Sequence, residues 1–222
     1  MPRSIRSAAD LPAIVPVFPL EGALLLPRAL LPLNVFEPRY LAMIDHALAT
    51  SRVIGIIQPA LEGGGKAAAD GDLPLATIGT LGRLTHFEER PDSRYVVALK
   101  GLTRFRVLEE IAAMTPFRQV RIDAAGFAAD FETGRGEKDV DRRAFLKVLR
   151  DYAEFARFDL DWDDVEKMPL EDLVNSCTMA SPYGPRERQA LLETATLRER
   201  ADMLTALAEI EMSHTAAGTT LQ

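Results

Sequence analysis

Residues 19–40 read Pro-Leu-Glu-Gly-Ala-Leu-Leu-Leu-Pro-Arg-Ala-Leu-Leu-Pro-Leu-Asn-Val-Phe-Glu-Pro-Arg-Tyr, the most informative part of the sequence. It contains two apolar runs, each interrupted by proline, and then passes directly into a helical pattern. Proline has no backbone N–H to donate to a neighbouring strand. Pro27 and Pro32 are therefore expected at strand ends, at sheet edges or at bulges.

A short amphipathic helix is predicted to follow these two runs. Pro38 suits the first helical position, and Glu37 places a negative charge beside the positive end of the helix dipole. Leu41, Ile44 and Leu48 recur at the spacing of one helical face. We expect that face to be buried.

The first half of the chain is predicted to be rich in β-structure. Strands are expected at 14–18, 30–36, 53–57, 77–89, 94–100, 103–111 and 117–123. Several short strands in close succession indicate a small barrel or sandwich. Residues 58–74 contain Gly-Gly-Gly at 63–65, Asp-Gly-Asp at 70–72 and two prolines, and they predict a loop. The length of this loop is typical of a functional or a disordered segment.

The composition changes after Gly126. Residues 124–138 are rich in alanine, glycine and charge and predict a connector, and everything beyond predicts helix. The helices are expected at 139–158, 169–181, 185–194 and 196–213. Thr196 and Glu199 have the spacing of a capping box, which places one helix start at 196.

Two apolar stripes are expected to hold the helical half together. They consist of Leu170, Leu173, Val174 and Cys177, and of Met203, Leu204, Leu207 and Ile210. The chain is therefore predicted to be α+β, with a β-rich subdomain at 1–125 and a helical subdomain at 126–222.

Composition limits the classes of function. The net charge of −7 and the pI of about 5.1 disfavour a general nucleic-acid surface. A single cysteine excludes an internal disulfide. The N-terminus lacks the apolar run of a signal peptide, and the apolar stretch 24–35 is shorter than the ~20 residues of a membrane span. The sequence therefore predicts a soluble, cytoplasmic protein that does not engage a membrane.

The residues predict no catalytic, cofactor or metal site. Glycines and a lysine at 62–67 lack the spacing of a phosphate-binding loop, and three scattered histidines with one cysteine lack zinc spacing. The carboxylates at 161–166 are interpreted as the start of a helix. Arg104 and Arg106 are expected on a solvated face of a strand, with contact to an acidic partner as the alternative.

Several motifs together resemble the N-terminal substrate-binding domain of the ATP-dependent Lon protease. The first is the 19–40 stretch itself. The others are Gly-Thr-Leu-Gly-Arg-Leu at 79–84, Gly-Leu-Thr-Arg-Phe-Arg-Val at 101–107, and the helical runs at 186–193 and 197–200. The resemblance extends across the whole layout. It implies a PUA-like β-barrel subdomain followed by a helical bundle, in agreement with the change of composition near residue 125.

The residues that carry the resemblance form a signature set. They are Pro27, Pro32, Phe36, Glu37, Arg39, Tyr40, Gly79, Gly82, Gly101, Arg104 and Phe105. Structural roles are expected for them. For Glu37, Arg39 and Tyr40 these are an ion pair and hydrogen bonds at the turn from strand to helix, with direct ligand contact as the alternative. Gly79, Gly82 and Gly101 are expected at tight turns or close backbone approaches.

The resemblance also implies a function. It suggests a stand-alone, non-enzymatic protein that binds unfolded or flexible polypeptide segments, as an adaptor or regulator of proteolysis and with a Lon-type protease as a partner. The chain ends at residue 222 without the ATPase and Ser-Lys protease domains of Lon. Apolar side chains in a groove, or a peptide added to a sheet edge, would mediate binding.

The sequence also suggests two binding regions and one alternative function. The loop at 58–74 and the seam between the β-rich and helical halves are the expected binding regions, since subdomain interfaces favour grooves. The alternative function is a PUA-like RNA-binding module, because a fold alone does not determine function.

Overall fold

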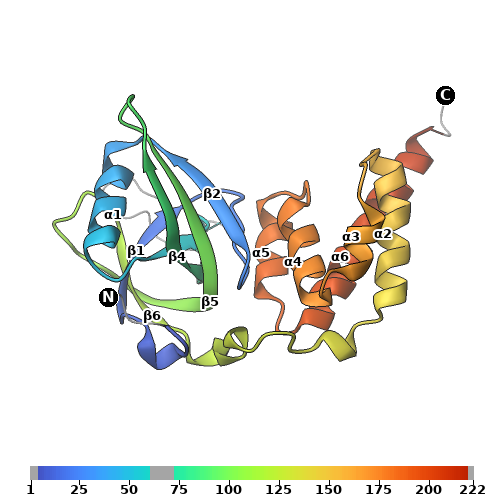
Figure 1. Ribbon diagram of the computed structural model, residues 1–222, viewed down its shortest axis with the longest axis horizontal. Coiled ribbons are helices and arrows are strands. Elements are labelled where there is room, and N and C mark those ends of the chain that lie inside the picture. Colours follow the sequence, from blue (N-terminus) through green and yellow to red (C-terminus); the bar gives the residue numbers. More distant parts are fainter. Residues whose placement is uncertain (1–4, 61–72, 220–222) are drawn as a thin grey trace. The chain divides into compact units, whose positions relative to one another are not determined.

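The computed structural model describes residues 5–60 and 73–219 (Figure 1). The chain forms two compact units. Unit 1 takes in Met1–Thr133 and Pro182–Leu192, and unit 2 takes in Gly134–Ser181 and Glu193–Gln222. The α+β class predicted from the sequence is confirmed, because unit 1 is built on a sheet and unit 2 on helices.

Unit 1 is built on one mixed sheet. Its strands are β1 (Ile14–Pro19), β2 (Leu30–Val35), β3 (Val53–Ile57), β4 (Ile78–Glu89), β5 (Tyr95–Ile111) and β6 (Gln119–Asp123). The order is β2-β5-β4-β3-β1-β6, with β1 and β3 parallel and the other pairs antiparallel. The second half of β5 also pairs with β6, which closes five strands into a ring and leaves β2 at an edge.

The prolines lie where the missing N–H predicts. Pro32 lies in the edge strand β2. Pro27 occupies the second position of a tight turn, in which Ala29 N–H donates to Leu26 O at 3.2 Å and Arg28 has a φ of 68°. The predicted edge position is confirmed for Pro32, whereas Pro27 lies in a turn before β2 and outside any strand.

One strand replaces two that the sequence predicts. Residues 94–100 and 103–111 were expected as separate strands with a turn at Gly101, yet β5 runs through Gly101 without interruption. Glycine serves a close approach here instead. A Cβ atom at this position would lie 2.0 Å from Leu26 O, and Arg28 N–H donates to Gly101 O at 2.9 Å. Gly101 thus lets the Pro27 turn pack directly on the strand.

The core of unit 1 gathers around the fully buried ring of Phe105. Its buried neighbours are Val15, Val17, Val53, Ile57, Leu81, Val120 and Ala124. The ring fits because Gly79 on the adjacent strand has no side chain, and a Cβ atom there would lie 2.9 Å from the Phe105 ring. Packing at this density leaves no room for an added methyl group.

Helix α1 (Pro38–Ala49) begins at the predicted proline, but it buries a different face. Tyr40, Met43, Ile44 and Ala47 are buried, whereas Leu41 and Leu48 are only half-buried. Contact with β1 selects this face, since the rings of Tyr40 and Phe18 lie 4.0 Å apart. The predicted stripe is therefore wrong except at Ile44.

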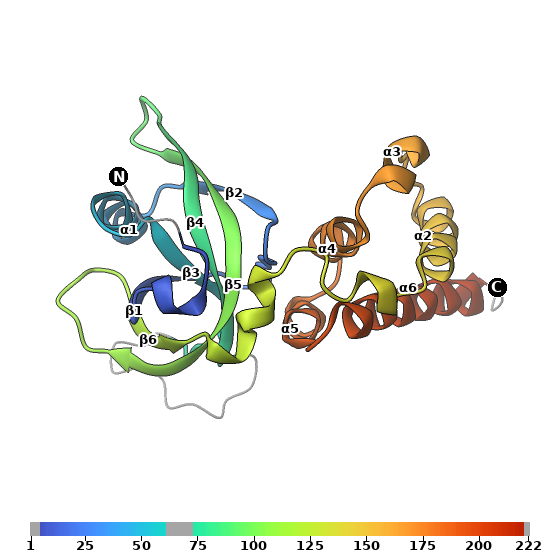
Figure 2. The same ribbon diagram turned by 60° about the horizontal axis from the view of Figure 1, so that its bottom comes forward.

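Unit 2 consists of η3 (Glu137–Asp139), α2 (Arg142–Ala156), α3 (Trp162–Lys167), α4 (Leu170–Ala180) and α6 (Leu197–Thr219). Figure 2 shows α6 as the long helix that α2 and α4 contact. Thr196 caps this helix as predicted, because Glu199 N–H donates to Thr196 Oγ1 at 3.1 Å. The Glu199 carboxylate accepts from Ala195 N–H at 2.9 Å, one residue before the position that a capping box uses.

The buried stripe of α6 differs from the predicted one. Leu204 is buried as expected, but Ala201 and Ala208 flank it in the core. Ile210 is 52% exposed, so its expected place in the stripe is wrong. Small residues let the neighbouring helices approach α6 closely, and the larger Ile210 remains outside that contact.

Helix α5 (Pro185–Glu193) packs into unit 1 through its polar side chains. Gln189 Nε2 donates to Ile78 O at 3.0 Å, and Arg188 Nη1 donates to Gly22 O at 2.8 Å. Buried Gln58 donates to Pro185 O and to Gln189 Oε1. The compact units therefore do not coincide with the expected subdomains 1–125 and 126–222.

Replacing Gly101 with alanine tests the close approach. The added Cβ collides with a backbone carbonyl, so we expect Gly101→Ala to lower the free energy of unfolding by about 1–3 kcal/mol, measured by urea denaturation. Gly126→Ala is the matched control, because a Cβ there meets no atom within 4 Å and should change stability by less than about 0.5 kcal/mol. Equal stabilities of the two variants would contradict the packing described.

Candidate functional site

The start of α1 brings three signature residues together. Arg39 Nε donates to Glu37 Oε2 at 3.0 Å, and the Arg39 guanidinium lies 4.6 Å from the centre of the Tyr40 ring. The N–H groups of Tyr40 and Leu41 both donate to Glu37 O at 2.9 Å. These contacts hold the turn from strand to helix, which is the structural role that the sequence suggested.

Arg104 lies in a different environment from the one predicted. Its side chain is buried, with Nε donating to Asp130 Oδ2 at 3.0 Å and Nη2 donating to Asp130 Oδ1 at 2.8 Å. Its Nη1 donates to Leu192 O at 3.2 Å, and its guanidinium lies 4.9 Å from the centre of the Phe127 ring. The expected solvated face is wrong for Arg104, because η2 (Ala125–Phe131) and α5 cover the strand here. Of the two arginines, only Arg106 is exposed.

Most other signature residues are also internal. Phe105 forms the core, Gly79 and Gly101 permit the two close approaches described above, and a Cβ at Gly82 would lie 2.9 Å from Leu99 Cβ. Pro32 and Phe36 are the exceptions, since both are exposed, Phe36 to 64%. Most residues of the signature set therefore stabilise the fold.

The carboxylate-rich segment at 161–166 begins a helix, as the sequence predicts. Asp161 Oδ1 accepts a hydrogen bond from Asp164 N–H at 3.2 Å and caps α3. Within residues 5–60 and 73–219, no cluster of three or more histidine, cysteine, aspartate or glutamate side chains could hold a metal ion.

Cys177 is the one sulfur nucleophile of the chain. It lies on α4, and burial raises the pKa of its thiol to about 11. The thiolate is the reactive form of cysteine. The side chain therefore remains a protonated thiol at neutral pH and is unsuited to nucleophilic chemistry.

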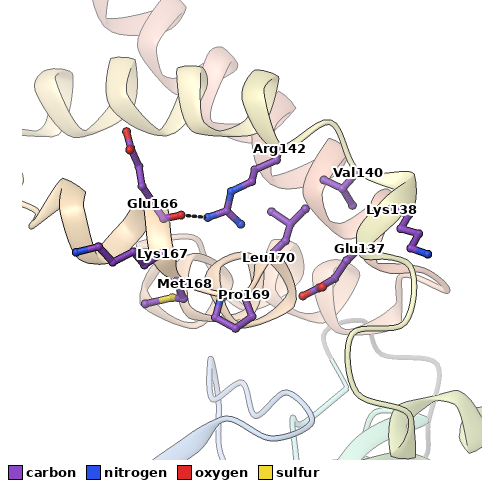
Figure 3. Close-up of a pocket in the computed structure, with 9 residues that line it drawn as sticks. All are labelled: Glu137, Lys138, Val140, Arg142, Glu166, Lys167, Met168, Pro169 and Leu170. Carbon is purple, nitrogen blue, oxygen red and sulfur yellow. Dashed lines mark hydrogen bonds between the residues drawn. The ribbon is translucent and has the colours of Figure 1, made fainter.

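A hollow of about 460 Å³ lies within unit 2, between η3, α2, α3 and the start of α4 (Figure 3). Arg142 points into it and donates to Glu166 O at 2.7 Å, and Glu137 Oε1 accepts from Glu171 N–H at 2.9 Å. Figure 3 shows Lys138 and Lys167 at opposite rims, with their side chains turned away from the hollow. Its inner polar groups thus join the helices to one another, and we assign no ligand to it.

A group of exposed aromatic rings lies at the C-terminal end of α2. We call Tyr152, Phe155 and Phe158 the aromatic cluster. The rings of Phe155 and Phe158 lie 6.0 and 6.3 Å from the ring of Tyr152, centre to centre. Phe155 is 36% exposed and Phe158 is 54% exposed. Aromatic rings grouped on a surface mark an interaction site more often than scattered apolar residues do.

Two local features produce the aromatic cluster. Phe145 and Ala153 lie on the buried face of α2, whereas Phe155 projects from its exposed side. The helix then ends at Arg157, whose left-handed backbone with φ of 58° reverses the chain and brings Phe158 back toward Tyr152. None of these three residues was predicted to form a site. The sequence pattern that could have identified them is an aromatic residue at every third position up to the end of a predicted helix.

The predicted loop at 58–74 falls largely outside the described residues, which omit 61–72. Its described ends pair, with Ala60 N–H donating to Pro74 O at 2.6 Å.

The sequence model of the ATP-dependent protease La (LON) substrate-binding domain matches residues 14–209. The chain belongs to this family. Lon protease 2 of Myxococcus xanthus is 28% identical over 219 residues, which are 91% of this chain and 24% of that protein. The Lon protease of Anaeromyxobacter dehalogenans is 32% identical over 211 residues, 88% of this chain and 23% of that protein. This LON substrate-binding domain thus spans about a quarter of the length of these relatives.

Two solved structures share the fold of this LON substrate-binding domain. The crystal structure of a Lon N-terminal domain protein from Xanthomonas campestris has a TM-score of 0.60 at 22% identity, over 87% of this chain and 97% of that one. The N-terminal domain of the Mycobacterium avium complex Lon protease has a TM-score of 0.65 at 18% identity, over 88% and 98%. None of the helices among the described residues has the length and apolar character needed to cross a membrane.

The raised pKa of Cys177 predicts slow alkylation. With a pKa of about 11, the thiolate fraction at pH 8 is about one in a thousand, against about one quarter for an ordinary thiol. Iodoacetamide labelling followed by mass spectrometry should therefore be slow in the folded protein, faster as the pH rises toward 11, and rapid in urea. Equal labelling rates at pH 8 with and without urea would contradict a buried thiol.

Proposed function

We propose that this chain binds exposed apolar segments of other polypeptides and does so without catalysing a reaction itself. Membership of a substrate-binding domain family supports the binding role, and the family match covers a substrate-binding domain only. The observation that carries the proposal is the aromatic cluster, which offers exposed rings to a polypeptide.

The physical basis is burial of aromatic surface. An aromatic side chain buries a large apolar area with few rotatable bonds, so it loses little conformational entropy when a partner covers it. Phe155 and Phe158 are more than one third exposed and are held next to Tyr152. Apolar side chains of an unfolded segment gain contacts here without a large rearrangement of α2.

Binding through side chains is favoured over addition of a strand. The free edge of the sheet is β2, and Pro32 lies within it. In an edge strand, proline occupies a position where the backbone N–H would otherwise face solvent. A peptide added to this edge would therefore find no donor at Pro32 and would lose one main-chain hydrogen bond.

The role of this binding is proposed to be that of an adaptor or regulator of proteolysis. The relatives that match the chain are Lon proteases, which supports a Lon-type protease as a partner. A bound segment would then be delivered to the protease or withheld from it. An RNA-binding role has less support, because Arg104 is committed to Asp130 and does not form a basic face with Arg106.

Removing the aromatic cluster tests the proposal. A labelled, unfolded, apolar peptide should bind in the roughly micromolar range, equivalent to about −8 kcal/mol, measured by fluorescence anisotropy. Phe155→Ser with Phe158→Ser should weaken binding by about tenfold or more, because both rings are exposed anchors. Thermal unfolding of the variant serves to check that the fold is retained.

The matched control removes exposed apolar side chains from unit 1. Leu108 and Met114 are 56% and 106% exposed. Replacing both with serine should leave the peptide affinity unchanged. An equal loss in both double variants would contradict the assignment of the site to the aromatic cluster.

Salt and activity measurements separate the rival functions. Binding of an uncharged apolar peptide should persist at high salt. The affinity for RNA would fall steeply, because the release of counterions contributes less free energy as the salt concentration rises. The chain should neither hydrolyse ATP nor cleave a denatured protein. Tight, salt-sensitive RNA binding without peptide binding would overturn the proposed function.

A further inference from the structure

The surroundings of the aromatic cluster carry an excess of carboxylates. We call these residues the acidic rim, and they are Asp151, Glu154, Asp159, Glu209 and Glu211. Asp151 lies one helical turn before Phe155, and Asp159 directly follows Phe158. Glu154 precedes Phe155 on α2. The first three carboxylates therefore share the end of α2 with the exposed rings.

The helix α6 supplies the other two carboxylates. Tyr152 Oη donates to Glu211 Oε2 at 2.9 Å, which places this carboxylate directly against the cluster. Glu209 lies close enough to Lys147 to raise the pKa of that ammonium, after the larger effects of the hydrogen bond and the charge of Asp151. The acidic rim thus extends from α2 across to α6.

Three cations lie between the middle of α2 and its end, namely Lys147, Arg150 and Arg157. Lys147 Nζ donates to Asp151 Oδ2 at 2.9 Å, so its charge is held between Asp151 and Glu209. Arg157 is exposed at the end of α2. The charge of Arg150 is balanced by its ion pair with Glu166. The five carboxylates of the acidic rim then outnumber Lys147 and Arg157, which gives the surroundings of the rings a net negative charge.

We infer that the aromatic cluster selects polypeptide segments in which lysine or arginine lies beside aromatic or aliphatic residues. This inference rests on the proposed function and names the chemistry of its ligand. The rings bind the apolar side chains, and the acidic rim attracts the neighbouring cations. A segment flanked by aspartate or glutamate meets repulsion at the same surface, so charge supplies the specificity while burial supplies the affinity.

The carboxylates of the acidic rim lie at the surface, which limits how much they change the affinity for a peptide. Charges at a surface interact weakly, but a segment with several cations engages more than one carboxylate. A peptide flanked by lysines should therefore bind about threefold to tenfold more tightly than the same apolar peptide flanked by glutamates, with a serine-flanked peptide between them. High salt should remove this ranking, because the screening length falls to about 3 Å at 1 M.

The experiment compares these three peptides by fluorescence anisotropy at low and high salt. The test variant is Glu154→Gln with Asp159→Asn, because both residues are exposed and neither forms an ion pair within the described part of the chain. It should lose the discrimination between the charged peptides and retain the affinity for the serine-flanked one. The control variant, Glu21→Gln with Glu89→Gln, removes the same charge from exposed positions of unit 1 and should keep the full ranking.

The outcomes distinguish the two proposals. If none of the three peptides binds, the proposed function fails. If the serine-flanked peptide binds and the charged peptides bind equally, the acidic rim has no role and the proposed function stands. If the control variant loses the ranking as fully as the test variant, the overall charge of −7 and not the rim attracts cations, which overturns the inference.

Discussion

The Arg104–Asp130 ion pair is the contact on which unit 1 depends. It joins the middle of β5 to η2, and the same guanidinium holds the carbonyl of Leu192 in α5. Removing two charges from water is costly, and such a pair survives only when hydrogen bonds satisfy both groups. Here Asp130 Oδ2 also accepts from Arg104 N–H at 2.8 Å and from Thr103 Oγ1 at 3.4 Å. Loss of either partner would leave a buried charge, at a cost of about 3–5 kcal/mol.

Much of unit 1 follows from residues whose backbone chemistry is unusual. Proline lacks a donor and glycine lacks a side chain, so the edge position of Pro32 could be predicted from sequence. The preference of proline for the first position of a helix likewise predicted the start of α1 at Pro38. Gly101 shows the limit of this reasoning, because glycine serves turns and close approaches alike. Only the position of Leu26 O decides between them.

Burial that depends on distant elements could not be predicted. Arg104 alternates with apolar residues along its strand, which indicates a solvated face, yet segments 26 and 88 residues further along the chain cover it. Ile210 fits an apolar stripe, but the alanines beside Leu204 make the close helix contacts instead. The aromatic cluster was missed for a related reason, since a helical spacing of aromatic residues normally indicates a core. The backbone reversal at Arg157 brings Phe158 beside the Tyr152 ring, and this placement depends on the fold.

The place of α5 has a consequence for how the chain folds during synthesis. Unit 1 is discontinuous, because Pro182–Leu192 belongs to it although most of unit 2 lies between. The ribosome releases the sheet long before the helix whose Gln189 and Leu192 complete its hydrogen bonds. Until then the guanidinium of Arg104 and the amide of Gln58 lack their α5 partners. Contacts between segments so far apart in sequence form slowly, because the ordering of the intervening chain opposes them. Completion of the β-rich unit is therefore tied to the emergence of the helical one.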